Sequence, residues 1–163
     1  MNQKTKQGRY LRIYEQLKEL LAKPGNDLSR MATIVAVLQH KMDCFFWTGF
    51  YLIDGDELIA GPYQGPVACQ KLDENKGVCW AAINRQETVI VPDVHKFPGH
   101  IACDSRSNSE IVVPLKNQNG KIIGVLDIDS KDFNAFDETD REGLEKIIAL
   151  LTHTFEGLCF EKK

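Results

Sequence analysis

The stretch SEIVVPLKNQNGKIIGVLDIDS, residues 109–130, decides the fold of this chain, because it holds two apolar runs on either side of a turn sequence. Asn119–Gly120 is a strong signal for a two-residue type I′ turn, which joins neighbouring antiparallel strands. The sequence therefore predicts a hairpin with strands at about 109–115 and 121–128.

The register of this hairpin would gather acidic side chains on one face of the sheet. With a two-residue loop, Gln118 pairs with Lys121, and continued pairing places Glu110 opposite Asp129. Side chains alternate between the two faces of a strand, so Asp127 shares the face of Asp129. Three carboxyl groups so close together would share a proton or hold a cation.

Pro114 is the weak point of that register. Proline has no N–H to donate to the sheet, so it favours an edge position or a bulge, and a bulge would cancel the predicted pairing. The alternative interpretation is that the three acids are ordinary solvated residues at strand ends.

The rest of the chain shows the periodicity of helices before and after a set of strands. An Asp54–Gly55 turn follows an aromatic strand, and Pro24–Gly25 ends the first helix. The predicted elements are helices at 10–22 and about 27–40 (capped by Asn26 or Asp27), strands at 44–53 and 57–60, a helix at 77–86, a strand at 88–91, the hairpin, and a helix at 138–160 capped by Asp137. This order predicts an α+β fold in which the terminal helices pack on one face of a central antiparallel sheet, reached as a meander interrupted by a short helix.

Length and charge limit the classes of protein that remain. The chain has 163 residues, which suits one domain at 1–163: N-terminal helices in 1–42, the sheet and its active-site loops in 43–130, and the last helix in 137–160. A formal net charge of −3 without a basic patch argues against a nucleic-acid partner. No window is apolar enough for a signal peptide or a membrane span, so we expect a cytoplasmic protein with reduced thiols.

The five cysteines differ in their surroundings. Cys44, Cys79 and Cys159 lie in strand-like or helical sequence and are most simply packed side chains. Cys69 and Cys103 lie in polar, glycine-bearing stretches where exposure is expected, and they are candidates for a reactive pair. No CxxC motif occurs, so the thioredoxin-type arrangement is absent.

A metal site around the histidines is the remaining alternative for this region. His95, His100, Cys103 and Asp104 offer suitable ligand types, but the H-x4-H-x2-C spacing matches no standard structural zinc site. We therefore expect no metal.

Four segments together resemble one family, the free methionine-(R)-sulfoxide reductases, which are built on a single GAF domain. They are GPYQGPVAC (61–69), KGVC (76–79), PDVHKFPGHIACDSRSNSEIVVPL (92–115) and IIGVLDIDS (122–130). The last segment is similar to GAF domains in general, whereas the VAC, GVC and HIACD segments mark the reductases. The resemblance extends from about Phe46 to the final helix. One departure is Trp80, which follows Cys79 where the family usually has a small residue.

The resemblance implies a GAF-like fold and an oxidoreductase that reduces free L-methionine (R)-S-oxide to L-methionine. It implies Cys103 as the nucleophile, which becomes a sulfenic acid, and Cys69 as the thiol that captures it as a disulfide, with Cys79 as the alternative. Thioredoxin would reduce that disulfide, and no metal, flavin or nucleotide cofactor is required. GAF proteins often dimerise through terminal helices, so helix 10–22 predicts a possible homodimer.

The same reaction needs a proton donor and a place for the amino acid. One of Glu110 and Asp129 would stay protonated and donate, while Asp127 and the ionised partner would hold the substrate ammonium. Trp47 would form an apolar wall for the terminal methyl group, although it is equally suited to be an ordinary core residue. Two other functions remain open: a non-catalytic GAF module that binds a small molecule, and a thiol redox sensor.

Overall fold

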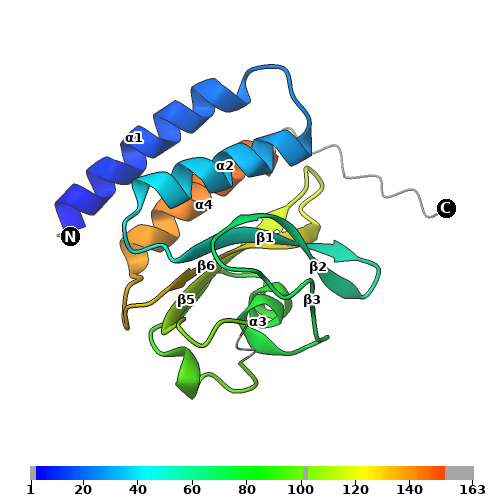
Figure 1. Cartoon of the computed structure of the whole chain (residues 1–163). Helices are drawn as coiled ribbons and strands as arrows, with labels where there is room; N and C mark the ends of the chain where they lie inside the picture. The colour runs from blue at the N-terminus through cyan, green and yellow to red at the C-terminus, as the bar shows by residue number, and fades with distance from the viewer. Residues whose placement is uncertain (1–2, 101–102, 153–163) are drawn as a thin grey trace.

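A computed structural model describes residues 3–100 and 103–152 of the chain (Figure 1). In chain order the elements are α1 (Gln3–Leu21), α2 (Asp27–Lys41), β1 (Trp47–Asp54), β2 (Glu57–Gln64), β3 (Lys71–Leu72), α3 (Gly77–Arg85), β4 (Val89–Val91), the short 3₁₀ helix η1 (Val94–Lys96), β5 (Ser109–Lys116), β6 (Ile122–Ser130) and α4 (Glu138–Thr152). The predicted continuation of the last helix to residue 160, with Phe155, Leu158 and Cys159, lies outside the described residues.

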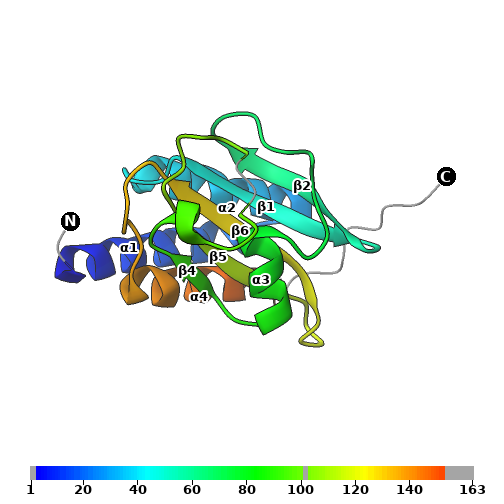
Figure 2. The ribbon, with the colours of Figure 1, turned by 90° about the horizontal axis from the view of Figure 1, so that it is seen from below.

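The strands form one antiparallel sheet in the order β3-β2-β1-β6-β5-β4. Helices α2 and α4 pack against one face of the sheet, α1 packs on the outside of these two helices, and α3 lies with the long loops on the other face (Figures 1 and 2). The α+β architecture with terminal helices on one face is therefore confirmed. Within the described ranges, no helix is both long enough and apolar enough to cross a bilayer.

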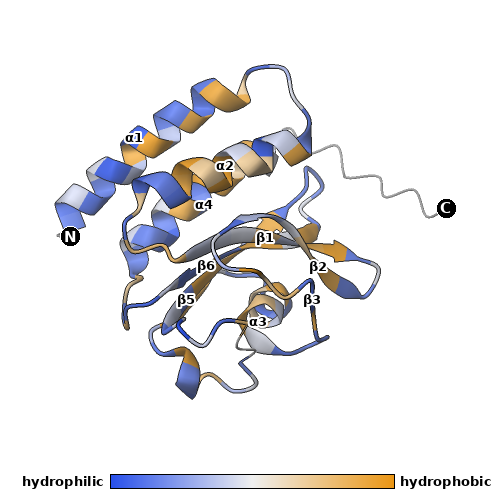
Figure 3. Ribbon diagram, viewed as in Figure 1, coloured by the Kyte–Doolittle hydropathy of each residue, from blue (hydrophilic) through white to orange (hydrophobic). Residues whose placement is uncertain are grey.

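The first helix begins at Gln3 and not at residue 10. Its first turns are polar and carry no periodic apolar signal, but Lys6 is buried there and forms ion pairs with Asp137 and Asp140. Tertiary pairing thus extends the helix beyond its apolar stripe. Along its length the ribbon of α1 alternates between apolar and polar segments, as expected for a helix with one buried face (Figure 3).

Asn26 lies at the N-terminus of α2 and stabilises the start of this helix. Its side chain accepts a hydrogen bond from the backbone N–H of Ser29 at 2.9 Å, and the hydroxyl of Ser29 accepts one in return from the Asn26 N–H at 3.1 Å. This reciprocal arrangement is a capping box, so Asn26 is the cap and Asp27 is the first helical residue.

The turn of the β5–β6 hairpin differs from the prediction. The backbone N–H of Asn117 donates to Lys121 at 2.9 Å, and three residues, 118–120, lie between them. Gly120 has a φ of +76°, which is the left-handed conformation that a three-residue hairpin loop requires at its last position. The predicted two-residue loop at Asn119–Gly120 is therefore wrong.

The predicted register is nevertheless confirmed, because a bulge next to the turn offsets the error. Strand pairing skips Ile123, so that Leu115 pairs with Gly124 and every later pair is shifted by one residue. Glu110 therefore lies opposite Asp129, as the sequence predicted. The extra loop residue and the bulge shift the register in opposite directions, so the acids lie where a hairpin with a two-residue loop would place them.

Pro114 takes the edge position that was expected. It pairs with Val125 of β6, but on its other side β4 reaches only as far as Val112. On that side, this part of β5 is therefore a sheet edge, where a missing N–H interrupts no ladder.

The centre of the sheet does not follow the predicted meander. Strand β1 pairs there with β6, which lies far from it in the sequence. Both strands are buried over most of their length, so they take the middle positions where both faces are covered. This pairing places Trp47 opposite Asp129 and Gly49 opposite Asp127. The crossover thereby assembles the site.

Strand β2 is longer than predicted, because residues 61–64 continue it into a stretch expected to be a loop. Glycine and proline in that stretch weakened the strand signal. Pro62 lies where the β1–β2 pairing is irregular, and β3 pairs only with Leu58 and Ile59. The loop that remains, 65–70, carries Cys69. Neither β3 nor η1 was predicted from the sequence.

The contact between α1 and α4 predicts a measurable stability effect. A Cβ atom at Gly143 of α4 would lie 2.4 Å from Cγ of Tyr10, whose ring packs against the helix. Gly143→Ala is therefore expected to lower the free energy of unfolding by about 1–3 kcal/mol, the usual cost of overpacking. Urea denaturation would measure the difference.

Gly8→Ala is the matched control, since Gly8 also lies in a helix. An added Cβ there meets only the end of the Arg12 side chain, at 3.4 Å. Relief of glycine's conformational freedom should stabilise that variant by up to about 1 kcal/mol. Equal unfolding midpoints for both variants and the parent would contradict the described packing.

Candidate active site

A pocket opens on the face of the sheet that carries α3. Counting the open solvent at its mouth, the space inside it is about 590 Å³. Most of the predicted site residues line it, whereas Cys69 reaches it only through its bond to Cys103. The lining residues are Trp47, Tyr51, Pro66, Val67, Ala68, Leu72, Lys76, Gly77, Val78, Cys79, His100, Cys103, Asp104, Ser107, Glu110, Asp127 and Asp129.

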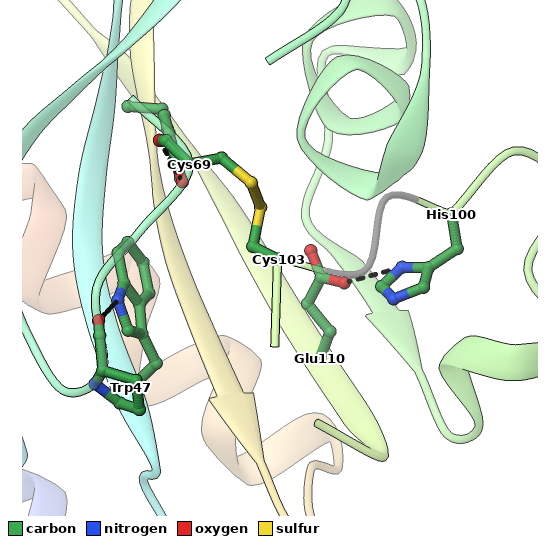
Figure 4. Close-up of a disulfide and its surroundings, with 7 residues drawn as sticks. Trp47, Cys69, His100, Cys103 and Glu110 are labelled. Carbon is green, nitrogen blue, oxygen red and sulfur yellow. Dashed lines mark hydrogen bonds and ion pairs between the residues drawn. A yellow bond between two sulfur atoms is a disulfide. The ribbon is translucent and has the colours of Figure 1, made fainter. Parts of the chain in front are cut away.

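Cys69 and Cys103 form a disulfide, with their Cα atoms 5.6 Å apart (Figure 4). They come from two different loops, 65–70 after β2 and the segment between η1 and β5. The Tyr51 hydroxyl donates to the backbone carbonyl of Cys69 at 3.1 Å and fixes that loop against β1. The structure therefore brings together the two cysteines that were considered as a pair.

The loop just after Cys103 is held by a local carboxylate–arginine pair. Asp104 accepts hydrogen bonds from the Arg106 backbone N–H at 2.9 Å and from its guanidinium at 2.9 and 2.6 Å. The bonds from Arg106 lower the pKa of Asp104 to about 2. The Arg106 guanidinium also lies over the Phe46 ring, 4.9 Å from its centroid. These contacts tie the Cys103 loop to the start of β1.

Three carboxyl groups form the floor of the pocket. Glu110 and Asp127 are buried, and Asp129 is partly buried. Burial raises the pKa of Glu110 well above its usual range, and the charges of Asp127 and Asp129 raise it further. Burial likewise raises the pKa of Asp127 well above its usual range and that of Asp129 to about 7. The cluster therefore retains protons at neutral pH, which a solvated set of strand-end acids would not.

Cys79 projects from α3 toward these acids. It is a free cysteine, and burial raises the pKa of its thiol well above the usual range, with further contributions from Asp127 and Glu110. Its Sγ and one carboxylate oxygen from each of Glu110 and Asp127 all lie within 4.8 Å of one another. The thiol is thus packed, as expected, but it borders the pocket.

Trp47 forms one wall of the pocket. Its indole N–H donates to the carbonyl of Pro66 at 3.2 Å, and the ring stacks with those of Tyr51 and Tyr63, with centroid distances of 5.7 and 5.4 Å. Gly49 permits this stack, because a Cβ there would lie 2.4 Å from both the indole and Tyr63. The indole is held in place by its neighbours and still lines the pocket.

Two further residues at the pocket, His100 and Ser107, had no part in the reaction predicted from the sequence. The His100 Nδ1 lies 3.7 Å from a carboxylate oxygen of Glu110 (Figure 4), and burial lowers the pKa of His100, so the ring stays neutral at pH 7. Ser107 forms a side-chain hydrogen bond with Asp129, which partly offsets the effect of burial on that carboxyl. Both residues lie in the polar loop sequence around Cys103, which indicated a site but not these partners.

The histidine-based zinc arrangement is not assembled. His95 bonds to Asp93 at 3.0 Å, Asp104 is engaged by Arg106, and Cys103 is in the disulfide. In the part of the chain that the structure describes, the group whose ligand atoms come close enough for a metal is instead Cys79, Glu110 and Asp127.

Comparison with known proteins identifies close relatives. The family model for the GAF domain matches residues 30–156. GAF domain-containing protein A of Dictyostelium discoideum is 47% identical over 90% of this chain and 92% of that protein. The free methionine-R-sulfoxide reductase of Escherichia coli is 42% identical over 94% of this chain and 92% of that protein. The X-ray structure of free methionine-R-sulfoxide reductase from Neisseria meningitidis, in complex with its substrate, is 42% identical, with a TM-score of 0.86 over 90% of this chain and 88% of that one.

Proposed function

Because this chain belongs to the GAF domain family, and within it to the free methionine-R-sulfoxide reductases, we propose that it reduces free L-methionine (R)-S-oxide to L-methionine. The observation that carries this proposal is the Cys69–Cys103 disulfide beside a pocket whose floor holds two buried carboxyl groups and a partly buried one. A thiol pair supplies two electrons, and the carboxyl groups supply the proton and the binding charge.

In the proposed first step, the reduced Cys103 attacks the sulfur of the sulfoxide as a thiolate. The S=O bond and the transient bond between the two sulfur atoms then break, the oxygen passes to Cys103 as a sulfenic acid, and methionine leaves. One proton is consumed as the oxygen is transferred. A carboxyl group that is still protonated near neutral pH is the suitable donor.

Glu110 and Asp129 are the proposed source of that proton. They lie opposite each other on β5 and β6, and burial raises the pKa of both. Two carboxyl groups in this position do not both ionise readily, so one retains a proton while the other carries charge. The pair therefore supplies both an acid and a carboxylate.

Asp127 and the ionised member of that pair are proposed to hold the ammonium of the free amino acid. Asp127 is buried, and its Oδ1 has no hydrogen-bond partner among the described residues. A substrate ammonium would satisfy this oxygen, whereas a peptide-bound methionine has no ammonium to offer. Trp47, which lines the same pocket, is proposed to contact the terminal methyl group.

The proposed second step is attack by the Cys69 thiol on the sulfenic acid, which forms the disulfide and releases water. Cys79, the alternative, is buried and its raised pKa leaves little thiolate for attack. The bonded pair in the structure therefore favours Cys69 as the resolving thiol. A dithiol protein such as thioredoxin is the proposed reductant, which returns both thiols by exchange.

We also propose a cellular location and an oligomeric state. Turnover by exchange with thioredoxin suits a reducing compartment, so we place the protein in the cytoplasm. A homodimer through α1 stays a prediction; Leu11 on that helix is largely exposed.

A stereochemical assay tests the function directly. The protein is incubated with racemic methionine sulfoxide and dithiothreitol, and the products are separated on a chiral column. We expect the R-sulfoxide to be consumed with matching release of methionine, while the S-sulfoxide remains. A binding module or a redox sensor would leave both sulfoxides intact, and that result would refute the proposal.

A further inference from the structure

Cys79 has no part in the proposed reaction, yet it faces the acids at the pocket floor. The cluster is assembled from three elements: Cys79 comes from α3, Glu110 from β5 and Asp127 from β6. All three residues are buried, and their ligand atoms lie within 4.8 Å of one another. A packed cysteine alone would need no such neighbours.

An independent observation points to a ligand at this place. Asp127 is only 7% exposed, and its Oδ1 has no hydrogen-bond partner among the residues that the structure describes. The residue lines the pocket. A buried oxygen of this kind is costly unless something enters the pocket to satisfy it.

The donor set matches the coordination chemistry of zinc. Zn²⁺ binds thiolate sulfur at about 2.3 Å and carboxylate oxygen at about 2.0–2.2 Å, so the ligand atoms of a tetrahedral site lie about 3.5 Å apart. The three atoms here lie within 4.8 Å of one another, so the side chains would have to move closer together by roughly 1 Å to reach the spacing of a zinc site. A hard cation such as Mg²⁺ requires more oxygen ligands and gains little from a thiolate.

We propose that Cys79, Glu110 and Asp127 form a binding site for Zn²⁺ at the floor of the pocket. Three protein ligands leave a fourth position that faces the pocket. The cation would occupy the place of the substrate ammonium at Asp127 and so compete with methionine sulfoxide. This consequence, unlike the site itself, rests on the proposed function.

The disulfide form of the protein gives the cleanest test of binding. In that form Cys69 and Cys103 are unavailable to a metal, whereas Cys79 remains a free thiol. Zinc sulfate is titrated into the oxidised protein against a chromophoric chelator of known affinity. We expect one zinc ion per chain, which millimolar Mg²⁺ does not displace.

Variants separate this site from other thiols. Outer-shell partners alone are worth 10- to 100-fold in metal affinity, so loss of a direct ligand in Cys79→Ser should weaken zinc binding by at least about 100-fold. Asp127→Asn should weaken it comparably. Cys44→Ala is the matched control, because Cys44 lies in the core region between α2 and β1, and it should bind zinc as the parent does. Thermal melts establish that each variant is folded.

Equal zinc affinity in folded Cys79→Ser and the parent would overturn the site. The function is tested separately, by sulfoxide turnover in the absence of zinc. Turnover without zinc binding to the oxidised form would remove the cation site and leave the reductase standing. Zinc binding without turnover would do the reverse.

Discussion

Replacing Cys103 by serine is expected to abolish methionine sulfoxide reduction, with kcat lowered by at least about 10³-fold. A serine hydroxyl is a far weaker nucleophile than a thiolate. Cys79, the other described thiol at the pocket, is buried with a raised pKa and does not substitute for it. Methionine release under dithiothreitol measures the effect.

Cys69→Ser is the matched control, because it removes the other half of the same disulfide. This variant keeps the proposed nucleophile and should release one methionine per chain before it stops under thioredoxin. Circular dichroism establishes that both variants are folded. Full activity of Cys103→Ser would end the assignment of the nucleophile, and sustained cycling of Cys69→Ser would move the resolving role to another thiol.

Replacing Asp127 by asparagine is expected to raise KM for free methionine sulfoxide by roughly 30- to 1,000-fold, the equivalent of about 2–4 kcal/mol. The physical reason is the loss of a buried carboxyl group that can ionise opposite the proposed substrate ammonium. The exchange is nearly isosteric, so the pocket shape is retained. Steady-state kinetics with the R-sulfoxide measures the change.

The choice of substrate shows whether the charge acts on the ammonium. N-acetylmethionine sulfoxide has no ammonium, so the parent should favour the free amino acid strongly and Asp127→Asn should lose much of that preference. Asp73→Asn, at an exposed acid paired with Lys76, should change neither value. An unchanged preference in Asp127→Asn would contradict the proposed role.

The hairpin illustrates what the sequence can predict. The strand pattern and the turn residues led to the correct partner for Glu110, even though the loop has three residues and the strand contains a bulge. The two departures cancel, and nothing in a local pattern of residues reveals such a cancellation. The partner of Glu110 was therefore predicted correctly, although neither the loop length nor the bulge was.

The contacts at the centre of the site could not be predicted from local sequence patterns. Pairing of β1 with β6 joins segments far apart in the chain, and it is this pairing that places Trp47 opposite Asp129. Packing of α3 against the sheet brings Cys79 to the acids, which its own helix could not indicate. The pairing of Cys69 with Cys103 came from the resemblance to a family and not from spacing. The sequence thus indicated which residues line the pocket better than it indicated which of them lie in contact.

The central claim is that methionine sulfoxide oxidises this pair of thiols beside the acidic pocket. The most direct measurement mixes fully reduced protein with one equivalent of the R-sulfoxide and no reductant, then alkylates free thiols and maps the peptides by mass spectrometry. We expect one methionine per chain, a bond between Cys69 and Cys103, and alkylated Cys44 and Cys79. Methionine release with the bond at Cys79, or no release at all, would contradict it.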